Sequence, residues 1–220
     1  TLLHTPAGEQ VLDFGQNLTG WVAFTVEAPV GTVIRLQHGE ILQDAQFYNT
    51  NLRTARAEYV YISDGTRQTV RPRFTFFGFR YVKVTGVDVK PEDWIAHVIH
   101  SDLPETGSAK VNRLIQNARC GQKGNFLDVP TDCPQRDERM GWTGDAQAFV
   151  GTAAYNMHVP AFYDKYLQDM ASAQRELGGA APHVVPDVIN MIYRQQGQAE
   201  DAMGSCGWGD AAAVIPWTMY

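Results

Sequence analysis

Residues 128–149 read DVPTDCPQRDERMGWTGDAQAF, and the rest of the chain is organised around this stretch. It contains the indole of Trp142 and charged side chains of both signs. The charged residues are Asp132, Arg136, Asp137, Glu138, Arg139 and Asp145. Pro134, Gly141 and Gly144 interrupt it, and neither helical nor strand periodicity runs through it. The pattern predicts a long, shaped loop that becomes helical near residues 143–145.

This predicted loop allows two interpretations. As a solvated surface loop, it would contain salt bridges that contribute little to stability. As a sugar site, it offers acceptors and forked donors for hydroxyl groups, and a flat apolar face for the C–H side of a ring. A glycosidase also needs a carboxylic acid that keeps its proton near the leaving oxygen. The combination of residue types favours the sugar site.

The segment TDCPQRDERMGWTGD at residues 131–145 resembles the signature of the bacterial α-L-rhamnosidases, which are inverting glycoside hydrolases that release terminal L-rhamnose. Three further segments are similar to parts of the same family: LDFGQNLTGWV at 12–22, FTFFGFRYVKV at 74–84 and GWGDAAAVIPW at 207–217. The resemblance therefore covers effectively the whole chain. It implies a glycosidase whose partner is a rhamnose-containing oligosaccharide or glycoside.

The resemblance also implies roles for single residues. Glu138, the glutamate of the RDER segment, matches the general acid of the family. The positions that hold rhamnose are matched by Asp132, Arg136, Trp142, Asp145 and Trp208. An inverting enzyme needs a second carboxylate as general base. In the family this glutamate lies farther along the barrel and has no match in the present sequence, so we expect these residues to be inactive alone.

Several of these residues have structural alternatives that the sequence leaves open. Asp132 also suits a turn before Cys133, and Asp145 suits the first turn of a helix, where the macrodipole favours a negative side chain. Asp210 is either a weaker sugar-site candidate or a helix cap. Arg139 is expected to be a structural partner of Asp137 rather than a ligand.

The general acid must keep its proton at the working pH. Burial and neighbouring anions such as Asp137 and Asp145 favour the protonated form of Glu138, whereas a close Arg136 or Arg139 favours the charged form. The sequence leaves open which influence prevails.

Hydrophobic patterning divides the chain at residue 103. Residues 1–103 contain short alternating runs separated by turns, which predicts an antiparallel, jelly-roll-like β-sandwich. Residues 104–220 show helical periodicity, with Ser108 as the expected cap of a helix that has Val111 and Leu114 on its apolar face. The resemblance implies that these helices are the first part of an incomplete (α/α)6 barrel, so the fold class is multi-domain β plus α.

A barrel that stopped at Tyr220 would expose helix faces. Val214, Ile215 and Trp217 would then form an apolar patch that favours self-association. Both ends of the chain read as cut within a longer protein, so the sequence leaves open whether that protein is cytoplasmic, periplasmic or secreted.

Composition limits the classes of binding partner that are expected besides a sugar. The net charge of −6, without a basic stripe, argues against nucleic acid and anionic membranes, and no run of eighteen apolar residues indicates a membrane span. Three cysteines, Cys120, Cys133 and Cys206, form no CxxC pair, so neither a disulfide framework nor a zinc site is predicted. No cofactor or metal is expected, although a calcium site in the sandwich would leave little signature.

Two other functions fit the same sequence. One is a different inverting glycosidase with an (α/α)6 barrel, using the same acid on another terminal sugar. The other is a carbohydrate-binding module in which aromatic residues of the β-sandwich hold the sugar. The candidates for that platform are Phe74, Phe76, Phe77, Phe79 and Tyr81, for which packing in the core is the favoured interpretation.

Overall fold

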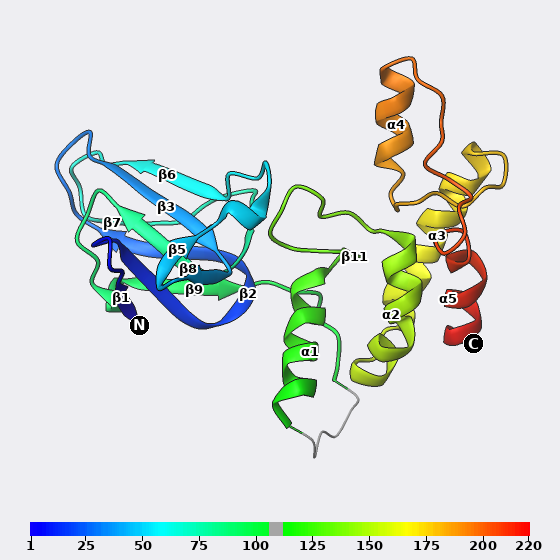
Figure 1. Ribbon diagram of the computed structural model, residues 1–220, viewed down its shortest axis with the longest axis horizontal. Coiled ribbons are helices and arrows are strands. Elements are labelled where there is room, and N and C mark those ends of the chain that lie inside the picture. Colours follow the sequence, from blue (N-terminus) through cyan, green and yellow to red (C-terminus); the bar gives the residue numbers. More distant parts are fainter. Residues whose placement is uncertain (106–111) are drawn as a thin grey trace. The chain divides into compact units, whose positions relative to one another are not determined.

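The computed structural model describes residues 1–105 and 112–220 (Figure 1). Contacts divide the chain into two compact units. The first contains Thr1–Ile99 and Pro134–Asp137, and the second contains His100–Cys133 and Glu138–Tyr220. The middle of the charged loop is therefore part of the first unit. Ser108 and Val111, which were expected at the start of a helix, lie outside the described residues.

The first unit is built from antiparallel strands. Its seven-stranded sheet has the order β1-β2-β8-β3-β6, and β7 and β9 also pair with β2. The strands of this sheet are β1 (Leu2–His4), β2 (Gln10–Val26), β3 (Val33–Gly39), β6 (Glu58–Ile62), β7 (Gln68–Val70), β8 (Phe77–Thr85) and β9 (Trp94–Val98). A separate hairpin joins β4 (Ile41–Gln43) to β5 (Gln46–Tyr48), and short 3-10 turns cover Thr50–Leu52 and Pro91–Asp93.

Strand β2 organises this unit because its 17 residues pair with four other strands. Along β2, residues 10–12 pair with β1 and residues 10–20 pair with β8. Residues 20–24 then pair with β9, and residues 24–26 pair with β7. The register with β8 shifts between Asp13 and Leu18, and such an irregularity bends a strand. Val22, Phe24 and Val26 on the second half are buried, as their alternation predicts.

The aromatic run before and within β8 is divided between core and surface. Phe77 and Phe79 belong to the core, which agrees with the packing interpretation. Phe74 is fully exposed and has a φ of 60°, so packing in the core was the wrong expectation for this residue. The fully buried His38 stacks on Phe77, with ring centroids 3.9 Å apart.

The second unit contains α1 (Asn112–Asn125), α2 (Thr143–Asn156), α3 (Pro160–Glu176), α4 (Val188–Gln195) and α5 (Ala211–Met219), with a small pairing of β10 (Phe126–Leu127) and β11 (Val129–Pro130). Pro160 opens α3 as expected for a proline in the first turn. Helix α4 begins after Asp187, whose side chain accepts a hydrogen bond from the N–H of Asn190. Leu114 is 77% exposed, which contradicts its expected place on a buried face.

Aromatic rings fill the core of the second unit. Phe126 stacks on Phe162 with centroids 4.6 Å apart, and Tyr163 and Tyr166 are fully buried. Ile215 of α5 also lies in this core, so its predicted exposure was wrong. Trp217 and Tyr220 are 87% and 97% exposed, and self-association through this face stays a prediction. The described part of the chain has no helix with the length and apolarity to cross a membrane.

Candidate active site

Two hydrogen bonds between Asp132 and Met140 join the two ends of the charged loop. The backbone N–H of Asp132 donates to the carbonyl of Met140 at 3.1 Å, and the N–H of Met140 donates to Oδ1 of Asp132 at 3.0 Å. Asp132 therefore has a structural role, but it joins two ends of a loop eight residues apart and does not form a local turn before Cys133. The sugar-binding role implied for Asp132 by the resemblance stays a prediction. These bonds are compatible with it, because a carboxylate can accept several hydrogen bonds.

Asp132 and Glu138 lie close together inside this closed loop. Ligand atoms of Asp132, Cys133 and Glu138 are all within 4.8 Å of one another, and Cys133 is a buried free thiol. Two carboxylates and a thiolate suit a divalent ion such as Zn²⁺. A carboxylate that binds a metal is deprotonated, whereas a general acid must carry a proton, so Glu138 cannot serve both purposes at once. The spacing of these three residues matches no metal motif, which is why the sequence did not indicate the group.

Hydrogen bonds from α3 and from the loop before α4 hold the start of α2. The carbonyl of Gly141 accepts from the Tyr166 hydroxyl and from the N–H of Val185, both at 2.9 Å. Thr143 donates its N–H to the carbonyl of His183 at 2.9 Å. A Cβ atom at position 141 would lie 2.2 Å from the Val185 carbonyl oxygen, so this close approach requires glycine. Trp142, between residues 141 and 143, is thereby held on both sides.

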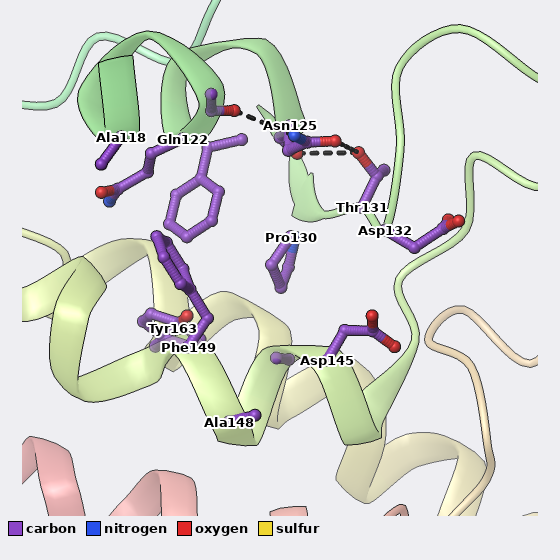
Figure 2. A pocket seen from close by; sticks show the side chains of 13 residues that line it. Ala118, Gln122, Asn125, Pro130, Thr131, Asp132, Asp145, Ala148, Phe149 and Tyr163 are labelled. Carbon is purple, nitrogen blue, oxygen red and sulfur yellow. Dashed lines mark hydrogen bonds between the residues drawn. The ribbon is translucent and has the colours of Figure 1, made fainter. Parts of the chain in front are cut away.

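Asp132 and Asp145 line the same pocket, which has a volume of about 350 Å³. Figure 2 shows Asp145 on α2 below the loop that carries Asp132, with Phe149 and Tyr163, which also line the pocket, farther to the left. Asp145 is also an acidic residue in the first turn of α2, where the helix dipole favours a negative charge. Its structural alternative and its proposed ligand role are therefore compatible.

Trp208 reaches the start of α2 from 64 positions farther along the chain than Gly144. A Cβ atom at Gly144 would lie 3.2 Å from the indole Nε1, so the ring lies against this glycine, next to Asp145. The indole is 38% exposed, and its centroid is 5.5 Å from that of His183. Asp210 occupies the N-cap position of α5, but its side chain makes no cap hydrogen bond to the helix. It accepts instead from the N–H of Gly207 at 3.1 Å, in the turn before α5.

Arg136 and Asp137 belong to the first unit. Asp137 accepts a hydrogen bond of 2.7 Å from the hydroxyl of Thr54, and this bond lowers the pKa of the Asp137 carboxyl. Arg53 lies 3.9 Å from the same carboxylate. The position of Arg136 toward the other candidates and the pairing of Arg139 with Asp137 stay predictions.

A β-sandwich followed by a helical unit, with carboxylates and indoles near the start of α2, is compatible with a glycoside hydrolase. Residues 3–100 match the family model described as the bacterial alpha-L-rhamnosidase concanavalin-like domain. Residues 103–220 match the model described as the bacterial alpha-L-rhamnosidase 6 hairpin glycosidase domain. The chain belongs to the bacterial α-L-rhamnosidase family, which confirms the resemblance and the predicted fold class.

Curated relatives agree with this assignment. An α-L-rhamnosidase of Streptomyces avermitilis is 44% identical over 222 residues, which are 97% of this chain and 20% of the relative. One of Formosa agariphila is 38% identical over 226 residues, which are 97% of this chain and 23% of the relative. The chain thus spans about a fifth to a quarter of the length of these relatives.

Solved structures show the same similarity. Native α-L-rhamnosidase from Aspergillus terreus has a TM-score of 0.90 and 35% identity, covering 100% of this chain and 26% of that structure. The Streptomyces avermitilis α-L-rhamnosidase, complexed with L-rhamnose, has a TM-score of 0.86 and 42% identity, covering 99% of this chain and 21% of that structure. These similarities extend over both units.

Proposed function

We propose that this chain takes part in the hydrolysis of terminal, non-reducing α-L-rhamnose from rhamnosides by an inverting acid/base mechanism. The observation that carries the proposal is that Asp132 lies beside Glu138 and lines the same pocket as Asp145. Family membership and the relative complexed with L-rhamnose support the choice of sugar. We propose residues 1–103 and 104–220 as the two domains.

In this proposal Glu138 is the general acid, which gives its proton to the glycosidic oxygen as the bond to the leaving group breaks. The sugar is held by two kinds of contact. Hydroxyl groups hydrogen-bond to Asp132, Arg136 and Asp145, and the apolar side of the ring packs on Trp142 and Trp208.

The general base must activate a water molecule on the opposite face of the sugar, from a carboxylate roughly 6.5–9.5 Å from the acid. Asp132 approaches Glu138 too closely for this separation, because their ligand oxygens lie within 4.8 Å. We propose that the base lies outside residues 1–220 and that these residues alone do not turn over substrate.

Replacement of Glu138 by Gln in the full-length protein tests the acid. For rhamnosides with poor leaving groups we expect kcat/KM to fall by about 10²–10⁴-fold, because general acid catalysis contributes about that much. Activated aryl rhamnosides need less protonation and should retain much more of their rate. Glu27→Gln, which alters an exposed glutamate of the first unit, is the control.

Full activity of Glu138→Gln on a poor leaving group would contradict the assignment. A hydrolysis assay also tests the separate proposal that the general base lies outside residues 1–220. Turnover of p-nitrophenyl α-L-rhamnoside by residues 1–220 alone would show that a base lies within them, whereas turnover by the full-length protein alone would support a base elsewhere.

A further inference from the structure

The segment Pro134–Asp137 approaches strand β8 without room for an intervening side chain. A Cβ atom at Gly78 would lie 2.9 Å from both the Pro134 carbonyl carbon and the Gln135 Cβ. Gly78 lies within the regular part of β8 and has no positive φ, so its backbone conformation does not require glycine. The close approach of the segment does require it.

The end of this segment is held by a second contact. The Thr54 hydroxyl donates a hydrogen bond of 2.7 Å to Oδ2 of Asp137. Because this bond favours the charged carboxylate, the pKa of Asp137 is lowered. A hydrogen bond to a charged acceptor is stronger than one between neutral groups.

Thr54 itself is carried by a well-anchored stretch of the first unit. Leu52, two residues earlier, is fully buried. Three residues later, the carbonyl of Ala57 lies 2.9 Å from the N–H of His38 and 3.0 Å from its ring Nδ1. The hydroxyl of Thr54 is therefore presented to Asp137 from a fixed backbone.

We propose that Thr54 and Gly78 are positioning residues for Glu138. Glu138 follows Asp137 in the chain, and Met140, two residues after Glu138, is hydrogen-bonded to Asp132. The proposed acid is thus attached to a backbone that is held on one side by Thr54 and Gly78 and on the other by Asp132. An error of about 1 Å in the position of a catalytic group can lower a rate by about 10²-fold.

This inference rests on the proposed function only in naming Glu138 as the acid. The restraint itself can be measured without activity, by hydrogen exchange of the backbone amides of residues 135–140 in the full-length protein. Thr54→Val removes the hydroxyl at nearly constant volume, and we expect these amides to exchange several-fold faster. Thr54→Ser keeps the hydroxyl and should exchange like the wild type.

Thr66→Val is the matched control. Thr66 donates a hydrogen bond of the same length, 2.7 Å, to the exposed Asp64 in the same unit. Its loss should leave the exchange rates of the amides of residues 135–140 unchanged. Equal exchange in Thr54→Val and in the wild type would overturn the proposal.

Kinetics of the full-length variants then test the link to Glu138. For a rhamnoside with a poor leaving group, kcat of Thr54→Val should fall about tenfold with little change in KM, because a displaced acid is less effective. For an activated aryl rhamnoside, kcat should fall less. Thr54→Ser should have the kcat of the wild type for both substrates. Gly78→Ala should act in the same direction more strongly, with Gly151→Ala, where a Cβ has open space, as the control.

Equal losses for both leaving groups, or no loss, would overturn the positioning role while the proposed function stands. Failure of the wild-type protein to hydrolyse rhamnosides would instead remove the proposed function. In that case the exchange measurement still decides whether Thr54 holds the segment.

Discussion

Buried polar groups act differently in the two units. In the first, His38 lies against Phe77 and Phe79, and burial lowers its pKa to about 4. In the second, the buried Tyr166 and Thr143 donate hydrogen bonds to carbonyls of the loops around the start of α2. Protonation of His38 would therefore destabilise the first unit, whereas loss of the hydrogen bonds of Tyr166 and Thr143 would destabilise the second.

The difference indicates which interactions shape the candidate site. Apolar packing determines the fold of a core, but it does not specify where a polar loop lies. Hydrogen bonds from rigid helices to loop carbonyls do specify this, and each has a cost if a buried partner is lost. The comparison can be tested by changing one kind of interaction at a time.

Gly141→Ala should have the largest effect. Its Cβ would lie 2.2 Å from the Val185 carbonyl oxygen, so the pairing of the two loops must open. We expect a loss of about 3 kcal/mol in the free energy of unfolding, as for severe overpacking. Urea unfolding monitored by fluorescence would measure it, with Gly151→Ala as the control. A loss below about 1 kcal/mol would show that the loops adjust easily.

The first unit should be destabilised by acid through His38. The pKa of His38 in the folded state, about 4, is below its usual value of 6.5, so the unfolded state binds more protons between these pH values. Stability is therefore full above pH 6.5 and falls as the pH decreases, by about 2 kcal/mol between pH 7 and pH 5.

Hydrogen exchange of the β8 amides at several pH values measures this trend after correction for the intrinsic exchange rate. His38→Gln lacks the titrating ring and should give a flatter dependence. An unchanged slope in that variant would contradict the assignment to His38.

Two neighbouring tyrosines of α3 give a matched pair. The Tyr166 hydroxyl donates to Gly141, whereas the Tyr163 hydroxyl is buried with no hydrogen-bond partner among the described residues. We expect Tyr166→Phe to cost about 1 kcal/mol and Tyr163→Phe to be neutral or stabilising. Urea unfolding compares them directly, and equal costs would argue against a special role for the bond to the loop.

The pair of Asp13 and Arg80 should have the smallest effect. Two hydrogen bonds from Arg80, at 2.8 and 2.9 Å, lower the pKa of Asp13. The stabilisation is therefore present above the unfolded pKa of about 3.9 and is lost as the pH falls through the lower folded value. Because the Arg80 side chain is 38% exposed, we expect Asp13→Asn to cost less than about 1 kcal/mol at pH 7. A larger loss in urea unfolding would show that solvent screens this pair poorly.

Much of the fold could be predicted from local patterns. Alternation placed Val22, Phe24 and Val26 in the core, and Pro160 marked the start of α3. The charged loop and the helix that follows it were also recognisable, because proline, glycine and mixed charges interrupt the periodicity before Thr143.

Other features depend on contacts that no local pattern records. The start of β2 is hard to recognise in the sequence, because residues 15–17 are exposed and break the alternation. Helix α4 is hard to recognise because prolines precede it and it spans only eight residues. Thr54 gave no signal, since its partner Asp137 lies 83 positions away. The proximity of Trp208 to Gly144 likewise arises only when the chain is folded.

The pairing of strand β2 also determines where the chain of the first unit can be divided. Four other strands depend on it, so a cut or insertion within Gln10–Val26 would remove pairing partners on several sides at once. The exposed turn at residues 64–67, between β6 and β7, interrupts no strand and is a suitable place for an insertion or for new chain ends. An engineered protein divided at this turn would keep β2 whole, and its two pieces could reassemble around it.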